Sequence, residues 1–146
     1  MPRRFTLAEA QSLIPQVSRL MQNTVALKIE FSAADQAVRG YLERVTMMGG
    51  MQLNREQVRA ARERRETTGA QLKAAIEELQ GLGCVVKDLD IGLVDFPTLY
   101  RGVEVCLCWK LGEERIEFWH GMEEGFRGRK RINEEFLQNH RGDPPQ

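Results

Sequence analysis

The sequence has no long apolar run and few cysteines. A membrane-spanning helix needs about 18 consecutive apolar residues, and no window of the chain approaches that length. The N-terminus has no apolar segment that would serve as a signal peptide. Cys84, Cys106 and Cys108 are an odd number of thiols in the second half of the chain, which is atypical of a disulfide framework. We therefore expect a protein of the reducing cytoplasm that does not enter a membrane.

The chain also lacks an excess of charge of either sign. Its 21 Lys and Arg residues are balanced by 21 Asp and Glu residues. This balance removes the long-range positive field that attracts nucleic acid, so any basic site must be a local patch. At 146 residues the chain can bury the core of one ordinary domain without disulfides or metals.

What the sequence does contain is an apolar repeat with a spacing of 3.5 residues over residues 10–48. Eleven of its twelve positions are apolar or aromatic, with Thr24 the exception. Such a repeat predicts one long helix with a coiled-coil seam. Thr6 and Glu9 have the spacing of a capping box at its start, and Pro15 predicts a kink. The glycines at positions 49 and 50 predict its end.

A second apolar repeat follows over residues 58–82, with Asn54 as the expected N-cap. The two repeats predict an antiparallel helical hairpin over residues 5–82, in which Phe31 lies near Leu72. Apolar residues beside the first seam make its stripe wider than one partner helix covers, which favours self-association. We expect a homodimer formed through the seam residues Leu13, Val17, Leu20, Leu27, Phe31, Val38, Tyr41 and Val45.

From Cys84 the apolar period changes to two, which predicts a small antiparallel meander over residues 84–120. Pairing Lys110 with Arg115 around a four-residue turn sets His120 opposite Val105. The predicted fold class is therefore α+β: a long antiparallel, coiled-coil-like hairpin followed by a meander packed on the first helix. We expect a single domain over residues 1–132, in which 121–132 form a Gly- and Arg-rich loop, and a short helix and disordered tail over 133–146.

The polar residues suggest two metal readings, each with a structural alternative. Asp88, Asp90 and Asp95 could hold Mg²⁺ or Ca²⁺, but Asp and Gly between short strands are also ordinary turn formers. Cys106, Cys108 and His120 suggest zinc. However, the predicted pairing puts His120 on the face opposite both thiols, and free cysteines are often packing residues. We therefore expect no metal and no cofactor.

A ligand site at the strand ends is a further alternative. Trp119 and His120 precede a glycine-punctuated loop, although a half-buried histidine closing the apolar face is the simpler interpretation. The basic run over residues 127–131 contains Arg127 and Arg129 and could bind phosphate or RNA, but it has no phosphate-loop spacing. The candidate ligand-binding residues are Asp88, Asp90, Asp95, Trp119, His120, Arg127 and Arg129.

Several short motifs resemble those of one family. They are Val86-Lys87-Asp88, Gly92-Leu93-Val94-Asp95-Phe96-Pro97, Leu107-Cys108-Trp109 with Gly112-Glu113, Phe118-Trp119-His120 and Gly125-Phe126-Arg127-Gly128-Arg129, preceded by Phe5-Thr6-Leu7 and Leu13-Ile14-Pro15. The chain resembles, from about Phe5 to Ile132, the bacterial family catalogued as domain of unknown function 2203. The resemblance implies a cytoplasmic bacterial protein with a helical hairpin and a small sheet. It implies no activity and no catalytic residues.

These features favour a non-enzymatic, self-associating interaction module, because no catalytic constellation is complete. A second copy, or another protein, is the expected partner. The alternative is an enzyme or a metal- or anion-binding protein that uses the strand-end residues, with the arginines on an anion and His120 as acid, base or ligand. A third reading is an RNA-associated factor that uses the basic run.

Overall fold

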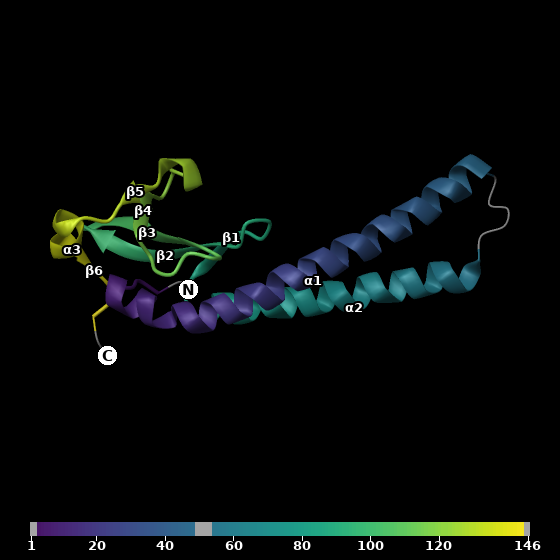
Figure 1. Cartoon of the computed structure of the whole chain (residues 1–146), viewed down its shortest axis with the longest axis horizontal. Helices are drawn as coiled ribbons and strands as arrows, with labels where there is room; N and C mark the ends of the chain where they lie inside the picture. Colours follow the sequence, from purple (N-terminus) through teal and green to yellow (C-terminus); the bar gives the residue numbers. More distant parts are fainter. Residues whose placement is uncertain (1–2, 49–53, 145–146) are drawn as a thin grey trace. The chain divides into compact units, whose positions relative to one another are not determined.

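The computed structural model describes residues 3–48 and 54–144 (Figure 1). Helix α1 (Leu7–Met48) and helix α2 (Arg55–Gln80) precede a six-stranded antiparallel sheet, which confirms the predicted α+β class. The chain divides into two compact units. We call Met1–Gln22 with Ile76–Gln146 the sheet unit, and Asn23–Ala75 the hairpin unit. The predicted helix end at residues 49 and 50 lies outside the described residues.

The start of α1 has the predicted capping box. The Glu9 amide donates to the Thr6 hydroxyl at 3.1 Å, and the Thr6 amide donates to the Glu9 carboxylate at 2.9 Å. These bonds satisfy two of the amides that a helix leaves unpaired at its first turn. The bond from the Thr6 amide also lowers the pKa of Glu9. The helix then continues through Pro15.

In the hairpin unit the two helices run antiparallel. The ring of Phe31 lies 3.1 Å from where a Cβ on Gly69 would be, and Asp35 pairs with Arg65 at 3.5 Å. Phe31 therefore meets Gly69, about one helical turn before the predicted neighbour Leu72. The absence of a side chain at Gly69 leaves room for the Phe31 ring.

The two polar residues in the seam of α2 are accommodated differently. Arg65 reaches across the hairpin to Asp35. Thr68 is buried, and its hydroxyl donates to the Arg64 carbonyl at 2.7 Å. The hydroxyl of Thr68 is thus satisfied within the buried contact, as buried polar groups require, whereas the Arg65 side chain stays 37% exposed.

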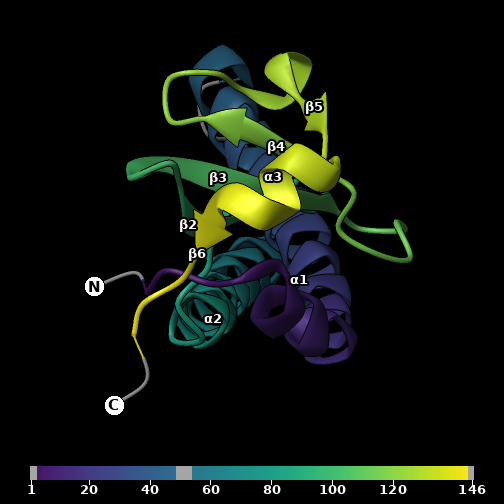
Figure 2. The same cartoon turned by 90° about the vertical axis from the view of Figure 1, so that its left-hand side faces the viewer.

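The sheet has the order β1-β2-β3-β4-β5, with β6 also on β2. Figure 2 shows α3 and β6 following β5 at the same end of the sheet. The bounds are β1 (Val85–Asp88), β2 (Leu93–Tyr100), β3 (Val103–Lys110), β4 (Phe118–Gly121), the 3₁₀ turn η1 (Phe126–Gly128), β5 (Lys130–Arg131), α3 (Glu134–Asn139) and β6 (His140–Arg141).

One face of the sheet packs on the first turns of α1. Phe96 pairs with Leu107 across β2 and β3, so both side chains lie on this face. The Phe5 ring meets the Phe96 ring edge-on at 5.4 Å between centroids, and the Gln11 side chain accepts from the Ile116 amide at 2.8 Å. The buried core on this side includes Ala10, Ile14, Val17, Met21, Leu79, Val94, Phe96, Leu107 and Trp109.

The pairing of β3 with β4 corrects the predicted register. Cys106 lies opposite His120, whereas the prediction placed Val105 there. The connection after Lys110 is longer than a four-residue turn, and Glu113 holds its conformation. The Glu113 carbonyl accepts from Trp109 Nε1 at 2.9 Å, and the Glu113 carboxylate accepts from the Lys110 amide at 2.7 Å. A shift of one residue exchanges the two faces of a strand. His120 therefore lies on the face of Cys106, and the argument that separated them was wrong.

Pro97 lies in the middle of β2, which is unusual for a residue without an amide hydrogen. β1 pairs with the start of β2 and β6 with its end, and Pro97 falls between them. Its carbonyl accepts from the Phe5 amide at 2.7 Å. Pro97 has no amide hydrogen to donate, and it lies at the stretch of the β2 edge between β1 and β6.

The C-terminal segment is part of the sheet unit, where the sequence led us to expect a disordered tail. Arg141 pairs with Leu99, and the Asp143 amide donates to the Arg4 carbonyl at 3.1 Å. The expected short helix is α3, with the Asn133 side chain accepting from the Phe136 amide at 2.8 Å. Phe136 is buried against the rings of Tyr100 and Trp119.

Candidate functional site

Three side chains of different chemistry meet on the face of the sheet that points away from α1. They are Asp95 on β2, Cys106 on β3 and His120 on β4, with exposed fractions of 1%, 4% and 3%. One side-chain oxygen, sulfur or nitrogen of each lies within 4.8 Å of those of the other two. The registers explain the meeting, because Asp95 pairs with Cys108 while Cys106 pairs with His120. The cluster is therefore held by three adjacent strands.

Both ring nitrogens of His120 face oxygen atoms. Nδ1 lies 2.8 Å from the Gly121 carbonyl, and Nε2 lies 2.9 Å from Oδ1 of Asp95. A carbonyl only accepts, so Nδ1 carries a hydrogen and donates it. Nε2 is then the ring atom that faces the Asp95 carboxylate.

The thiols beside this pair are protonated at neutral pH. Burial, followed by the negative charge of Asp95, raises the pKa of Cys106 to about 12 and that of Cys108 to about 12. The charge of Arg129 opposes this rise at Cys108. Nucleophilic cysteines need the thiolate, which these surroundings disfavour. The cluster is therefore poorly suited to covalent catalysis by sulfur.

Arg129 is fixed beside the cluster by charge and by aromatic rings. Its guanidinium donates to both carboxylate oxygens of Glu113, at 2.9 and 2.8 Å, and lies 4.0 Å from the Phe118 ring centre and 4.8 Å from that of Phe126. Its Nε atom is buried and has no hydrogen-bond partner among the described residues. A bidentate ion pair of this kind positions the loop after η1 against the turn after β3.

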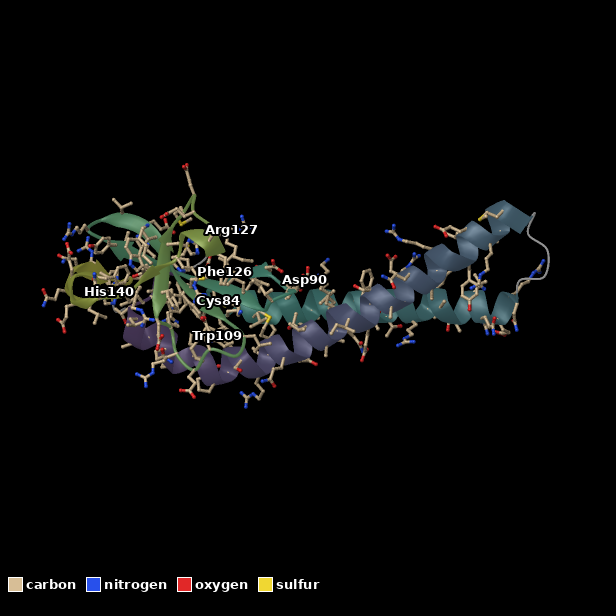
Figure 3. All side chains as sticks on the ribbon, turned by 45° about the horizontal axis from the view of Figure 1, so that its top comes forward. Cys84, Asp90, Trp109, Phe126, Arg127 and His140 are labelled. Carbon is tan, nitrogen blue, oxygen red and sulfur yellow. The ribbon has the colours of Figure 1, made fainter. Side chains whose placement is uncertain are left out.

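The other acidic residues of the predicted site lie apart from the cluster. Asp88 and Asp90 are exposed at the turn between β1 and β2, where the Asp88 side chain accepts from the Asp90 amide at 2.8 Å. This bond is the local turn contact that Asp commonly makes. Figure 3 shows Asp90 on this turn and Arg127 on the loop that follows β4, so the two come from separate connections.

Of the remaining predicted residues, Trp119 points to the opposite face. It pairs with Leu107, packs on Tyr100 at 5.1 Å between ring centres, and lies under Lys130 at 4.6 Å. Arg127 is exposed in η1. The structure thus brings together Asp95 and His120 from the predicted set. It adds Cys106, which could not be assigned to the site while the strand register was wrong.

A groove of about 810 Å³ lies at the first turn of α1. His140, one of its lining residues, uses both ring nitrogens within the fold: Nε2 accepts from the Leu7 amide at 3.0 Å and Nδ1 donates to the Leu137 carbonyl at 2.8 Å. Arg131, another lining residue, lies 3.7 Å from Glu117. The histidine that lines this groove therefore has both ring nitrogens in hydrogen bonds within the chain.

A second groove, of about 390 Å³, lies entirely within the hairpin unit. Apolar side chains from both helices form its floor, and three arginines of α2 line its rim. Its lining residues are Tyr41, Leu42, Val45, Arg55, Val58, Arg59 and Arg62. Three of the predicted seam residues are informative here: Val17 and Val38 are fully buried within the chain, whereas Val45 is 41% exposed.

The two long helices and the antiparallel sheet that follows them define an α+β protein with a buried Asp–Cys–His cluster. The chain belongs to the family of uncharacterised conserved proteins DUF2203, whose model matches residues 3–132. This match confirms the resemblance noted from the sequence motifs. Neither the curated proteins nor the solved structures contain a match to the chain. Within the described residues, neither long helix is apolar enough over sufficient length to cross a membrane.

Proposed function

We propose that the protein is a non-enzymatic interaction module that associates with a second copy of itself through the far part of the hairpin unit. The observation that carries this proposal is the apolar groove there. Leu42 is 46% exposed and Val45 is 41% exposed at this groove, and Met47 on the same helix is 84% exposed. Exposed apolar patches on helices commonly mark protein contacts.

Some of the predicted seam residues pack between α1 and α2, so they are not available to a second copy. Val38 is 1% exposed, and Phe31 packs against Gly69 of α2. A substitution at Phe31 or Val38 would therefore destabilise the hairpin itself, so it could not test self-association separately. The surface left for a partner is therefore the groove around Leu42, Val45 and Val58.

The charges around the groove favour a second copy as the partner. Exposed residues of both signs alternate here, and Arg59 pairs with Glu56 at 2.7 Å. A two-fold interface presents the same patch from both chains, so arginines of one copy can face glutamates of the other. A strongly acidic or strongly basic partner would meet like charges instead. The exposed charges of this region are Glu43, Arg44, Arg55, Glu56, Arg59, Arg62, Glu63, Arg64 and Glu66.

Two further observations support a role without catalysis in the cytoplasm. Neither of the two grooves described above is lined by Asp95, Cys106 or His120. The three cysteines, all within the described residues, are free thiols, as expected in a reducing compartment.

The contacts of the basic run do not favour RNA binding. Arg129 pairs with Glu113, Lys130 pairs with Glu124 at 2.6 Å, and Arg131 lies 3.7 Å from Glu117. Carboxylates of the same chain thus neutralise most of the patch that a phosphate backbone would need.

The test is the oligomeric state of the full chain, measured by sedimentation velocity over a range of concentrations. Leu42→Glu and Val45→Glu each place a charge in the proposed contact, and both should convert a dimer into a monomer while leaving helix content by circular dichroism unchanged. Ile29→Glu is the matched control. Ile29 is 66% exposed on the same helix, and this substitution should leave the dimer intact.

Two outcomes contradict the proposal. One is a wild-type chain that stays monomeric at every concentration. The other is a dimer that persists in Leu42→Glu and Val45→Glu but dissociates in Ile29→Glu, since that pattern would place the contact on a different face of α1.

A further inference from the structure

We propose that Asp95, Cys106 and His120 form a binding site for a divalent transition-metal ion of the zinc type. This inference is independent of self-association, because all three residues belong to the sheet unit and the proposed dimer contact belongs to the hairpin unit. The site would hold the ion with three protein ligands and leave a fourth position for another ligand.

The ligand set suits zinc better than a hard cation. A thiolate, an imidazole and a carboxylate are the three ligand types that proteins use for Zn²⁺. Ca²⁺ and Mg²⁺ prefer oxygen ligands alone. The only oxygen side chain of the cluster is Asp95, so sulfur and nitrogen set its selectivity.

The distances are compatible with one ion. At usual zinc–ligand lengths, ligand atoms of a tetrahedral site lie about 3.4 to 3.6 Å apart. The three atoms here lie within 4.8 Å of one another, and Nε2 of His120 is 2.9 Å from Oδ1 of Asp95. An ion therefore requires side-chain shifts of about 1 Å, in which the sulfur approaches and the His–Asp contact opens.

The orientation of His120 is a second, independent observation. Its Nδ1 donates to the Gly121 carbonyl at 2.8 Å, which directs Nε2 toward Asp95 and Cys106. Histidines that bind metals nearly always donate their other ring hydrogen in this way, and the bond fixes both tautomer and ring orientation. The backbone of β4 thus prepares His120 for ligation.

The cluster lies close enough to the protein surface for an ion to reach it. Met122 is 55% exposed, and its sulfur lies 3.5 Å from the sulfur of Cys106. A flexible, half-exposed methionine therefore contacts the thiol ligand directly. Rotation of this side chain would open a path to the cluster without movement of the strands.

Binding would displace the thiol proton of Cys106, because metal ligation needs the thiolate. Nε2 of His120 and a carboxylate oxygen of Asp95 would bind the ion in place of their contact with each other.

The first experiment is equilibrium dialysis of the untagged full chain against Zn²⁺, followed by elemental analysis. We expect one tightly held ion per chain. Cys106→Ser, His120→Gln and Asp95→Asn should each weaken the affinity by more than about 10-fold, since even loss of a residue that only supports a ligand costs that much. Cys84→Ser is the matched control and should keep the ion, because Cys84 is a buried free thiol of the same unit whose sulfur contacts the Leu79 carbonyl and lies outside the cluster.

Two further readouts do not depend on variants that fold. Cobalt(II) added to the wild-type chain should give a thiolate-to-metal charge-transfer band, as expected for sulfur ligation. Calorimetric titration with Zn²⁺ in buffers of different ionisation enthalpy near neutral pH should show proton release, as ligation by a thiol requires.

The proposal is overturned if the wild-type chain binds no Zn²⁺, or binds it without a sulfur band and without proton release, which would indicate exposed carboxylates such as Asp88. Equal loss of the ion in Cys106→Ser and Cys84→Ser would overturn the assigned ligand set. Leu42→Glu should bind the ion normally, which separates this result from that of self-association.

Discussion

The Nε2 atom of His120 lies 2.9 Å from Oδ1 of Asp95, and the side chains of both residues are almost fully buried. Because the other ring nitrogen donates to the Gly121 carbonyl, Nε2 is the atom that faces the carboxylate, and each buried side chain is the other's polar partner. The consequences of this arrangement can be measured even without a ligand.

Asp95→Asn and His120→Gln should each lower the free energy of unfolding by about 1 to 3 kcal/mol, because each exchanges the buried contact between a carboxyl and an imidazole for a weaker neutral hydrogen bond. The double variant should cost less than the sum of the two single variants, as expected for residues in direct contact. Urea denaturation without added metal measures the free energy of unfolding of the wild type, the two single variants and the double variant. Asp88→Asn, at an exposed turn, is the control and should change stability by less than about 0.5 kcal/mol. Additive effects would contradict a coupled pair.

Alkaline pH should destabilise the fold through its thiols. Burial raises the pKa of Cys84 from 9.0 to about 11. Between these values the unfolded chain loses the proton and the folded chain keeps it, so the stability contributed below pH 9 is lost as the pH rises toward 11. The expected slope is about 1.4 kcal/mol per pH unit for each such thiol.

Chemical denaturation from pH 8 to 11 under reducing conditions tests this expectation. In Cys84→Ala the fall in stability with pH should be shallower by the contribution of one thiol, whatever the effect of the substitution at pH 8. An identical slope in the variant and the wild type would show that Cys84 does not titrate in this range.

Gly92 should tolerate alanine less well than Gly102 does. Both have positive φ angles, +66° and +79°, so alanine at either position costs about 1 kcal/mol of backbone strain. At Gly92 the added Cβ would also lie 2.6 Å from Cβ of Leu111, whereas nothing lies within 4 Å of it at Gly102. Thermal unfolding of Gly92→Ala should therefore show about 1 to 3 kcal/mol more destabilisation. Equal effects would mean that the β1–β2 turn moves away from Leu111 easily.

Phe136→Ala should destabilise the chain by about 3 to 5 kcal/mol, although Phe136 lies beyond the residues matched by the family model. Phe136 is 1% exposed and stacks on Tyr100 at 4.9 Å between ring centres. The neighbouring Leu137 is 43% exposed, so Leu137→Ala should cost much less. Urea denaturation distinguishes the two. Similar small effects in both variants would show that α3 adds little to the sheet unit.

Much of the fold could be predicted from local patterns. The capping box of Thr6 and Glu9, the long first helix and the change from helices to strands after residue 84 each depend on neighbouring residues, and each is present in the structure. The strand register depends on a longer interaction. Glu113 bonds to Lys110 and Trp109 and is paired with Arg129, sixteen residues later, so no local turn rule contains the information.

The candidate site could be predicted only in part, because its composition depends on the strand register. Asp95 and His120 could be selected from the sequence because acidic and imidazole groups near strand ends often bind ligands. Cys106 could not join them, since a one-residue error in register moves it to the other face. Strand β6 was not predicted for a related reason: it has two residues, and its pairing with β2 joins segments about forty residues apart.

The arrangement around β2 also limits how copies of this protein can meet. β3 covers one edge of β2 along its whole length, while β1, the Phe5 amide and β6 share the other edge. No described stretch of β2 is left to accept a strand from another chain, which is the usual route to domain swapping and fibrils. β2 is therefore protected from pairing with a strand of another chain.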